Sequence, residues 1–121
     1  MKHNWAATEL QFAMECLNRG VEVYQPLLPA TKGYDFLVVS DGKPHRVQVK
    51  HTMKPGEDGR FSVKFNTANR EESDFYAVYC VEYTRWYIFP TPKHRKADRI
   101  RFTPGGKYKK YIERWDLLKN S

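Results

Sequence analysis

The chain has 121 residues, of which 40% are hydrophobic and 15% aromatic, and it carries a formal net charge of +7. This composition suits one folded domain over residues 1–121 and excludes a disordered chain, and no apolar run approaches the roughly 20 residues of a membrane-spanning helix. The first residues lack the apolar core of a secretory signal, so a cytoplasmic location is expected.

The predicted elements begin with a helix over residues 5–18. Asn4 is a typical N-cap residue, and Gly20 stands where a helix-terminating glycine belongs. The buried face of this helix is predicted from apolar residues at helical spacing: Leu10, Ala13, Met14 and Leu17.

Several strands are expected after the helix, because apolar residues alternate or run between turn signals. They are predicted at residues 21–27, 34–40, 45–51, 61–65, 75–83, 85–89 and 100–102, with a loop at 53–60 and a loop or single helical turn at 66–73. A C-terminal amphipathic helix is indicated by Tyr108, Tyr111, Ile112 and Trp115. This order predicts a mixed α/β sheet rather than the regular alternation of a doubly wound fold.

The pair Asp41-Gly42 is a strong signal for a two-residue hairpin turn. Such a turn places Asp35 directly opposite Gln48, and the two-residue period of a strand puts Lys50 on the same face as Gln48. The opposite, core-facing side is then formed by Phe36, Val38, Val47 and Val49. A slip of one residue would send Asp35 and Gln48 to different faces.

This polar group has the chemistry of a metal-dependent phosphodiesterase. The carboxylate of Asp35, the amide oxygen of Gln48 and the backbone carbonyl of Val49 are oxygen ligands of the kind that Mg²⁺ prefers. Lys50 can hold an attacking water or stabilise charge on a phosphate, and Glu9, at the border of the helical stripe, can reach over the polar face of the sheet. A simple Asp–Lys salt bridge, an outward-facing glutamine and a surface glutamate are equally typical, and spacing alone does not separate the two interpretations.

Charge is distributed unevenly along the chain. Residues 1–83 contain 10 Lys or Arg and 11 Asp or Glu, whereas residues 84–121 contain 11 and 3. A basic segment at 93–119 indicates a polyanionic partner, with nucleic acid favoured over a merely solvated basic surface.

The only cysteines, Cys16 and Cys80, lie in apolar segments without zinc-ligand spacing and are expected to pack as small hydrophobes.

The pattern resembles the PD-(D/E)xK nuclease superfamily over nearly the whole chain. The likeness is to homing endonucleases of group I introns that have this fold, and more distantly to archaeal Holliday-junction resolvases. It is carried by the helix with Glu9 that ends in Asn18-Arg19-Gly20, by Asp35, and by four quoted stretches: RVQVK at 46–50, DFYAVY at 74–79, WYIFP at 86–90, and YIERWDLL at 111–118.

The resemblance implies a restriction-endonuclease-like mixed β-sheet core flanked by helices. It also implies that Asp35 and Gln48 are metal ligands for Mg²⁺ or Mn²⁺, that Lys50 is the catalytic lysine, and that Glu9 is an auxiliary acid. Gln48 departs from the usual Asp or Glu, which removes one negative charge and predicts weaker Mg²⁺ binding.

Double-stranded DNA is the expected partner. We expect its backbone to be contacted by Lys54, Arg60, Lys93, Arg95, Lys96, Arg99, Arg101, Lys107, Lys109 and Lys110. Cutting both strands needs two active sites, so a homodimer or higher homo-oligomer is expected, with the 75–83 strand and the aromatic residues of the last helix as candidate interface residues. Three functions stay open: a sequence-specific, homing-like Mg²⁺-dependent DNA endonuclease, a junction resolvase or repair-type nuclease, and an inactive DNA-binding module.

Overall fold

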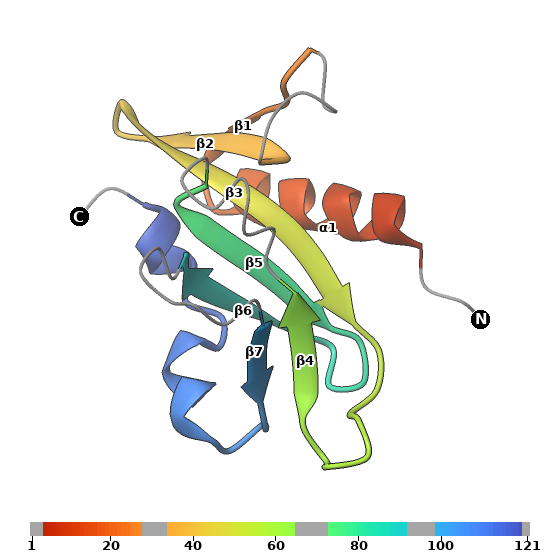
Figure 1. Cartoon of the computed structure of the whole chain (residues 1–121). Helices are drawn as coiled ribbons and strands as arrows, with labels where there is room; N and C mark the ends of the chain where they lie inside the picture. The colour runs from red at the N-terminus through yellow and green to blue at the C-terminus, as the bar shows by residue number, and fades with distance from the viewer. Residues whose placement is uncertain (1–3, 28–33, 65–72, 92–98, 120–121) are drawn as a thin grey trace.

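The computed structural model describes residues 4–27, 34–64, 73–91 and 99–119. Its elements are α1 (Trp5–Asn18), β1 (Glu22–Tyr24), β2 (Phe36–Ser40), β3 (Lys43–Thr52), β4 (Phe61–Lys64), β5 (Phe75–Cys80), β6 (Arg85–Pro90), β7 (Arg99–Phe102) and two 3₁₀ segments, η3 (Lys107–Tyr111) and η4 (Trp115–Leu118). Five strands form one mixed sheet in the order β1-β2-β3-β5-β6, and β4 and β7 pair separately (Figure 1). The predicted mixed α/β fold is confirmed. No helix in the described ranges is long and apolar enough to cross a membrane.

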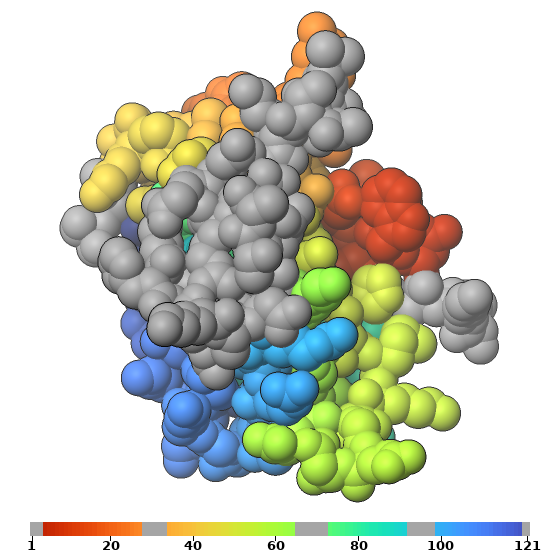
Figure 2. All heavy atoms as spheres, viewed as in Figure 1, coloured from red at the N-terminus to blue at the C-terminus, as the bar shows by residue number. Residues whose placement is uncertain are grey.

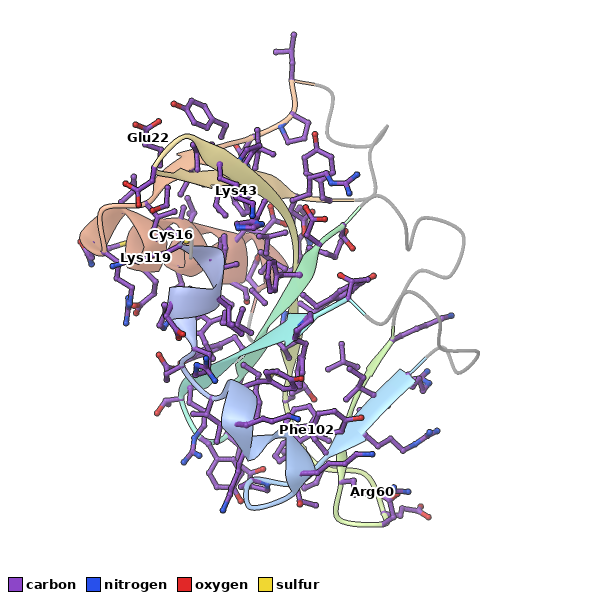
Figure 3. All side chains as sticks on the ribbon, turned by 90° about the vertical axis from the view of Figure 1, so that its left-hand side faces the viewer. Cys16, Glu22, Lys43, Arg60, Phe102 and Lys119 are labelled. Carbon is purple, nitrogen blue, oxygen red and sulfur yellow. The ribbon has the colours of Figure 1, made fainter. Side chains whose placement is uncertain are left out.

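Apolar side chains are buried on both faces of the five-stranded sheet. On one face they pack beneath α1 and η4, and on the other they pack beneath the β4–β7 ribbon and η3. Figure 3 shows these layers side by side, with Cys16 in the helical layer and Phe102 in the ribbon layer. Both cysteines are buried and free, as expected.

The β2–β3 hairpin has the predicted turn, and its register is as predicted from Ser40–Lys43 to Phe36–Val47. The prediction that Asp35 lies directly opposite Gln48 is wrong, because the Asp35 amide donates to the carbonyl of Val47, the residue that already pairs with Phe36. Asp41 and Gly42 both adopt positive φ angles, 54° and 79°, which is the conformation that matches the twist of a tight hairpin. Ser40 pairs with Lys43 and Phe36 with Val47, as an Asp-Gly turn requires. The alternation of buried and half-buried residues along both strands follows from this register.

Both ends of α1 are where the sequence predicts them. Asn4 caps the first turn, its Oδ1 accepting a hydrogen bond from the Ala6 amide at 2.7 Å. At the other end Gly20 has a φ of +76°, and the Val21 amide donates to the Cys16 carbonyl at 2.9 Å. A left-handed residue is needed to terminate the helix in this way, and glycine adopts that conformation without strain.

The predicted buried face of α1 is wrong except for Ala13, which is partly buried against the core. The helix buries Thr8, Phe12 and Cys16, while Leu10, Met14 and Leu17 expose 60–68% of their surface. The ring of Phe12 explains the orientation, because it packs against three aromatic rings at centroid distances of 5.4–5.9 Å: Phe36, Trp86 and Trp115. The strong packing of one large ring among others outweighs the wider stripe of aliphatic side chains.

The C-terminal segment is not the predicted α-helix. It forms η3 and η4, separated at Glu113, whose φ of 51° breaks any continuous helix. The Glu113 carboxylate accepts hydrogen bonds from the Trp86 amide at 2.6 Å and the Trp115 indole at 2.7 Å, and its own amide donates to the Trp86 carbonyl at 2.8 Å. These tertiary hydrogen bonds to β6 and η4 replace those of a regular helix.

The sequence also suggests a subunit interface made by the 75–83 strand and the aromatic residues of the last helix. Most of these residues are buried or half-buried inside the protein, so the predicted interface is wrong for most of its length. β5 lies between β3 and β6, and its side chains are buried on both faces of the sheet, as is Trp115 in η4. Residues 66–72 of the predicted 66–73 loop lie outside the described ranges.

Candidate active site

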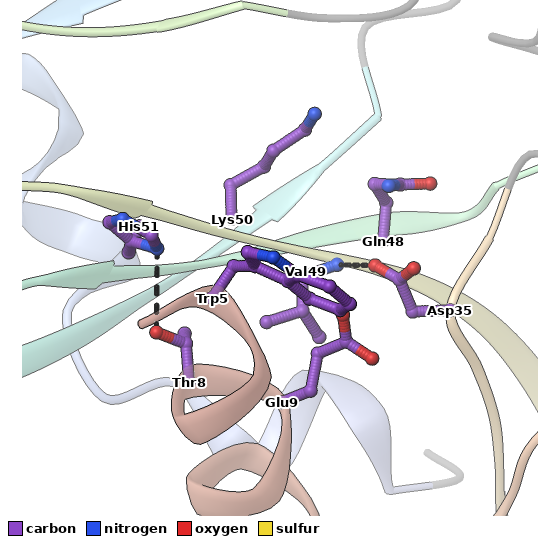
Figure 4. A pocket seen from close by; sticks show the side chains of 8 residues that line it. All are labelled: Trp5, Thr8, Glu9, Asp35, Gln48, Val49, Lys50 and His51. Atoms are coloured by element: carbon purple, nitrogen blue, oxygen red, sulfur yellow. Dashed lines mark hydrogen bonds between the residues drawn. The ribbon is translucent and has the colours of Figure 1, made fainter. Parts of the chain in front are cut away.

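A cleft of about 370 Å³ opens where the N-terminal half of α1 meets β3. It lies at the point where β2 stops pairing with β3 and the sheet edge becomes accessible. Figure 4 shows the side chains that line it: Trp5, Thr8, Glu9, Asp35, Gln48, Val49, Lys50 and His51. All four side chains predicted to be catalytic are therefore brought to one cleft.

Asp35 is fixed just before the first residue of β2. Its amide donates to the Val47 carbonyl at 2.9 Å, and its Oδ2 accepts from the Val49 amide at 2.7 Å. The N–H and C=O groups of one residue in an extended strand point to the same side. The Val49 carbonyl is thereby directed to the same sheet edge as the Asp35 carboxylate, which is the position predicted for a backbone ligand.

Glu9 approaches this edge from α1. Burial raises the pKa of Glu9, and the nearby Asp35 carboxylate raises it further. Burial also raises the pKa of Asp35, against the opposing effects of the Val49 amide and the Lys50 ammonium. The cleft thus holds two partly desolvated carboxylates whose ionised forms repel each other, an arrangement that a bound cation would stabilise.

Gln48 and Lys50 lie on the other side of β3 from α1. The parallel pairing places Gln48 beside Tyr76 and Lys50 beside Val78, and these two β5 side chains pack towards the β4–β7 ribbon. Figure 4 shows Gln48 and Lys50 projecting away from the helix that carries Glu9. The expectation that Glu9 reaches over the polar face of the sheet is therefore wrong: it comes to the sheet edge from the opposite side.

Thr8 and His51 line the cleft and were not singled out in the sequence. Thr8 is 1% exposed, and its Oγ1 lies 3.4 Å from Nδ1 of His51. The position of His51 could have been predicted from strand alternation, because residues 49 and 51 lie on the same side of β3 and Val49 faces the helix. The contact ties the first turns of α1 to the strand that carries Lys50.

The donor set of the cleft suits a hard divalent cation with few protein ligands. No group of three His, Cys, Asp or Glu side chains with metal-binding geometry occurs within the described ranges. Two carboxylates, one amide oxygen and one backbone carbonyl are available at the cleft, and they are all oxygen donors. Such a set fits an ion that keeps several waters or completes its shell with substrate oxygens, and it does not fit a structural zinc site.

The predicted DNA-binding residues fall into three groups. Lys54 and Arg60 are exposed in the loop before β4, and Figure 3 shows Arg60 at the outer end of that loop. Arg99 and Arg101 lie on β7, and three exposed lysines belong to η3: Lys107, Lys109 and Lys110. Figure 2 shows the 53–64 and 99–111 segments side by side on one part of the surface. The other predicted contacts lie outside the described residues: Lys93, Arg95 and Lys96.

Comparison with known proteins identifies the family. A family model described as PD-(D/E)XK endonuclease matches residues 2–117. The chain belongs to the PD-(D/E)XK endonuclease family. Among curated protein sequences, none matches this PD-(D/E)XK chain significantly.

Solved structures that share the fold of this PD-(D/E)XK protein include a homing endonuclease and a junction resolvase. The bacterial homing endonuclease I-Ssp6803I superimposes with a TM-score of 0.79 at 23% identity, over 94% of this chain and 87% of its own. Hjc, a Holliday junction resolvase from the archaeon Archaeoglobus fulgidus, superimposes with a TM-score of 0.69 at 12% identity, over 97% and 98%. The restriction-endonuclease-like arrangement implied by the sequence resemblance is confirmed.

Proposed function

We propose that this PD-(D/E)XK protein is a Mg²⁺-dependent DNA endonuclease that hydrolyses phosphodiester bonds at a specific sequence, in the manner of a homing endonuclease. The observation that carries the proposal is one cleft lined by Asp35 and Glu9 at the sheet edge and by Lys50 from the other side of β3. Carboxylates on one side and an ammonium on the other are the groups that hydrolysis of a phosphodiester requires.

Asp35, the Val49 carbonyl and the Gln48 amide are proposed to hold the metal. The Val49 amide fixes the Asp35 carboxylate before any ion binds, so little reorganisation is needed. Bound Mg²⁺ or Mn²⁺ would supply a positive charge that polarises the phosphate and makes water a better nucleophile. Glu9 would act as an auxiliary carboxylate that orients the attacking water, because it lies near Asp35 on the helix side.

Lys50 is proposed to contact the scissile phosphate. It projects from β3 on the face that the β4–β7 ribbon covers, whereas Glu9 comes from the opposite face. A phosphate at the sheet edge would therefore lie between the carboxylates and the ammonium. The ammonium is suited to offset the charge that develops on the phosphate oxygens in the transition state.

DNA is proposed to approach along the outer face of the ribbon. Phe61, Val63, Ile100 and Phe102 face inwards, so the intervening residues of each strand face out. Lys64 pairs with Arg99 and Ser62 with Arg101, which places three cations on the outer face. A two-stranded ribbon of this kind fits the major groove of B-form DNA.

Replacing two ribbon cations by Lys64→Ala and Arg101→Ala is expected to weaken DNA binding uniformly across sequences. Each lost phosphate contact lowers the slope of log K against log salt concentration by about 0.9. Fluorescence anisotropy over a salt series measures both effects. Lys43→Ala, on the exposed hairpin tip, is the matched control, and an equal loss with that variant would contradict a specific role for the ribbon.

Cleavage with and without metal tests the proposed function. We expect a plasmid or randomised duplex library to be cut in Mg²⁺ or Mn²⁺ and to stay intact with a chelator, because the two carboxylates cannot act on an anionic phosphate without a cation. Binding without cleavage on every substrate and with either metal would instead indicate an inactive DNA-binding module.

A junction resolvase or repair-type nuclease is the second candidate, favoured by the fold shared with Hjc. Four-way junctions and linear duplexes of the same sequence separate the two, since a resolvase prefers the branched substrate. Because one cleft provides a single set of catalytic groups, a homodimer or larger assembly for cutting both strands is part of the proposal.

A further inference from the structure

The outer face of α1 is apolar although it lies on the surface. Leu10, Met14 and Leu17 project from the side of the helix opposite the buried stripe, and Trp5 is 67% exposed at its first turn. A helix that is apolar on both sides is typically covered on both sides. Figure 1 shows the sheet on one side of α1 and no other labelled element on its outer side.

A groove of about 840 Å³ runs between this face and the β1–β2 edge of the sheet, where Val23, Gln25 and Phe36 form its second wall. Small side chains, Ala6 and Ala13, lie between larger ones, Leu10 and Leu17, so that the surface has both hollows and projections. Met14 stands outside the groove lining as an exposed projection. The groove continues to Glu9 and Asp35, so whatever covers it also lies beside the catalytic cleft.

The charge of α1 excludes nucleic acid as the occupant. The helix contains two glutamates and no lysine or arginine, in a chain with a net charge of +7. The helix therefore has no cationic side chain that could bind a phosphate group. It also lacks the basic residues that an amphipathic helix needs on its polar face to bind an anionic membrane. The depletion of cations and the enrichment in Trp, Met and aliphatic side chains are instead typical of the centre of a protein–protein interface.

We propose that the outer face of α1 is the self-association surface of this protein, where α1 of a second copy packs along a two-fold axis. Leu10, Met14 and Leu17 each expose 60–68% of their surface on this face, and Trp5 borders the groove at its cleft end. A specific interface buries about 800 Å² per partner, so the contact includes these side chains together with the groove beside them. A two-fold contact needs a self-complementary patch, and projecting Leu10 and Met14 side chains facing the hollows over Ala6 and Ala13 satisfy that requirement. The basic ribbon lies on the other face of the sheet and stays free for DNA.

Sedimentation of the full chain without DNA or metal tests this surface, and its outcome is independent of the proposed nuclease activity. We expect the wild type to sediment as a dimer at micromolar concentration. Leu10→Lys combined with Leu17→Lys should raise the dimer dissociation constant by about 100-fold, since two charges would be buried at the centre of the contact. Met53→Lys, which also charges an exposed apolar side chain but lies after β3, is the matched control and should leave the dimer intact.

Both substitutions on α1 are at exposed positions, so the variant is expected to keep its far-ultraviolet circular dichroism spectrum. A second readout uses Trp5, which is exposed while Trp86 and Trp115 are buried: acrylamide quenching of wild-type fluorescence should fall with increasing protein concentration and not change for the α1 variant. A wild type that remains monomeric, or an α1 variant that sediments like the wild-type dimer, would overturn the proposal.

Discussion

Asp35→Asn should lower the rate of metal-dependent DNA cleavage by about 10³-fold or more, because a neutral amide cannot hold a divalent cation beside a second carboxylate as a carboxylate does. Asparagine has nearly the same shape, and its side-chain oxygen can still accept the hydrogen bond from the Val49 amide. The loss should therefore be one of chemistry and not of folding. Single-turnover cleavage of a defined duplex measures it.

The same substitution should not destabilise the protein at neutral pH. The folded-state pKa of Asp35 is raised by burial, so ionised Asp35 favours the unfolded state. Its favourable contribution is fully present below the unfolded pKa and is lost as pH rises through the folded pKa. Removing the charge should leave the Tm at pH 7 unchanged or higher. Mg²⁺ should raise the Tm of the wild type and should leave that of the variant unchanged. A variant that melts well below the wild type would show that Asp35 acts mainly as a structural residue.

Lys50→Ala should lower the cleavage rate by about 10²–10³-fold while the protein still binds DNA and metal. Lys50 lies on the ribbon side of β3 and contributes one cation beside the carboxylates, so its loss removes transition-state stabilisation and at most one phosphate contact. Cleavage under single-turnover conditions and anisotropy with uncleaved DNA in Ca²⁺ separate the two effects.

Two variants sharpen the interpretation of Lys50. Lys50→Arg keeps the charge but changes its shape and reach, and only partial activity is expected. Lys54→Ala, in the loop that follows β3, removes an exposed cation without altering the cleft and should affect binding more than the rate. If Lys50→Ala cuts DNA at the wild-type rate, Lys50 has no part in the reaction.

The catalytic strand region could be predicted because its information is local. The Asp-Gly turn sets the register of the β2–β3 hairpin, and this register decides that Val47 and Val49 face the core. The pairing ends at Phe36 and Val47, and Asp35 is held to β3 by its own hydrogen bonds to Val47 and Val49. The ends of α1 were equally accessible, since Asn4 and Gly20 act through hydrogen bonds and backbone angles within a few residues.

The errors arose where packing at a distance decides the outcome. Glu113 has a sequence context that favours a helix, yet its carboxylate binds Trp86 and Trp115 and interrupts one. The side from which Glu9 approaches depends on which face of the sheet α1 covers, and no residue of the helix encodes that directly.

The sequence by itself determined the family resemblance, the hairpin register and the set of polar residues that meet at the cleft, because turn chemistry and strand alternation act over short distances. Only the tertiary structure decided which face of α1 is buried. Phe12 finds three aromatic partners in β2, β6 and η4, residues far apart in the chain, and their combined packing turns Leu10, Met14 and Leu17 to the surface. Helical periodicity shows which sides of a helix are apolar. Which of those sides is buried depends on the side chains that the rest of the fold places against the helix.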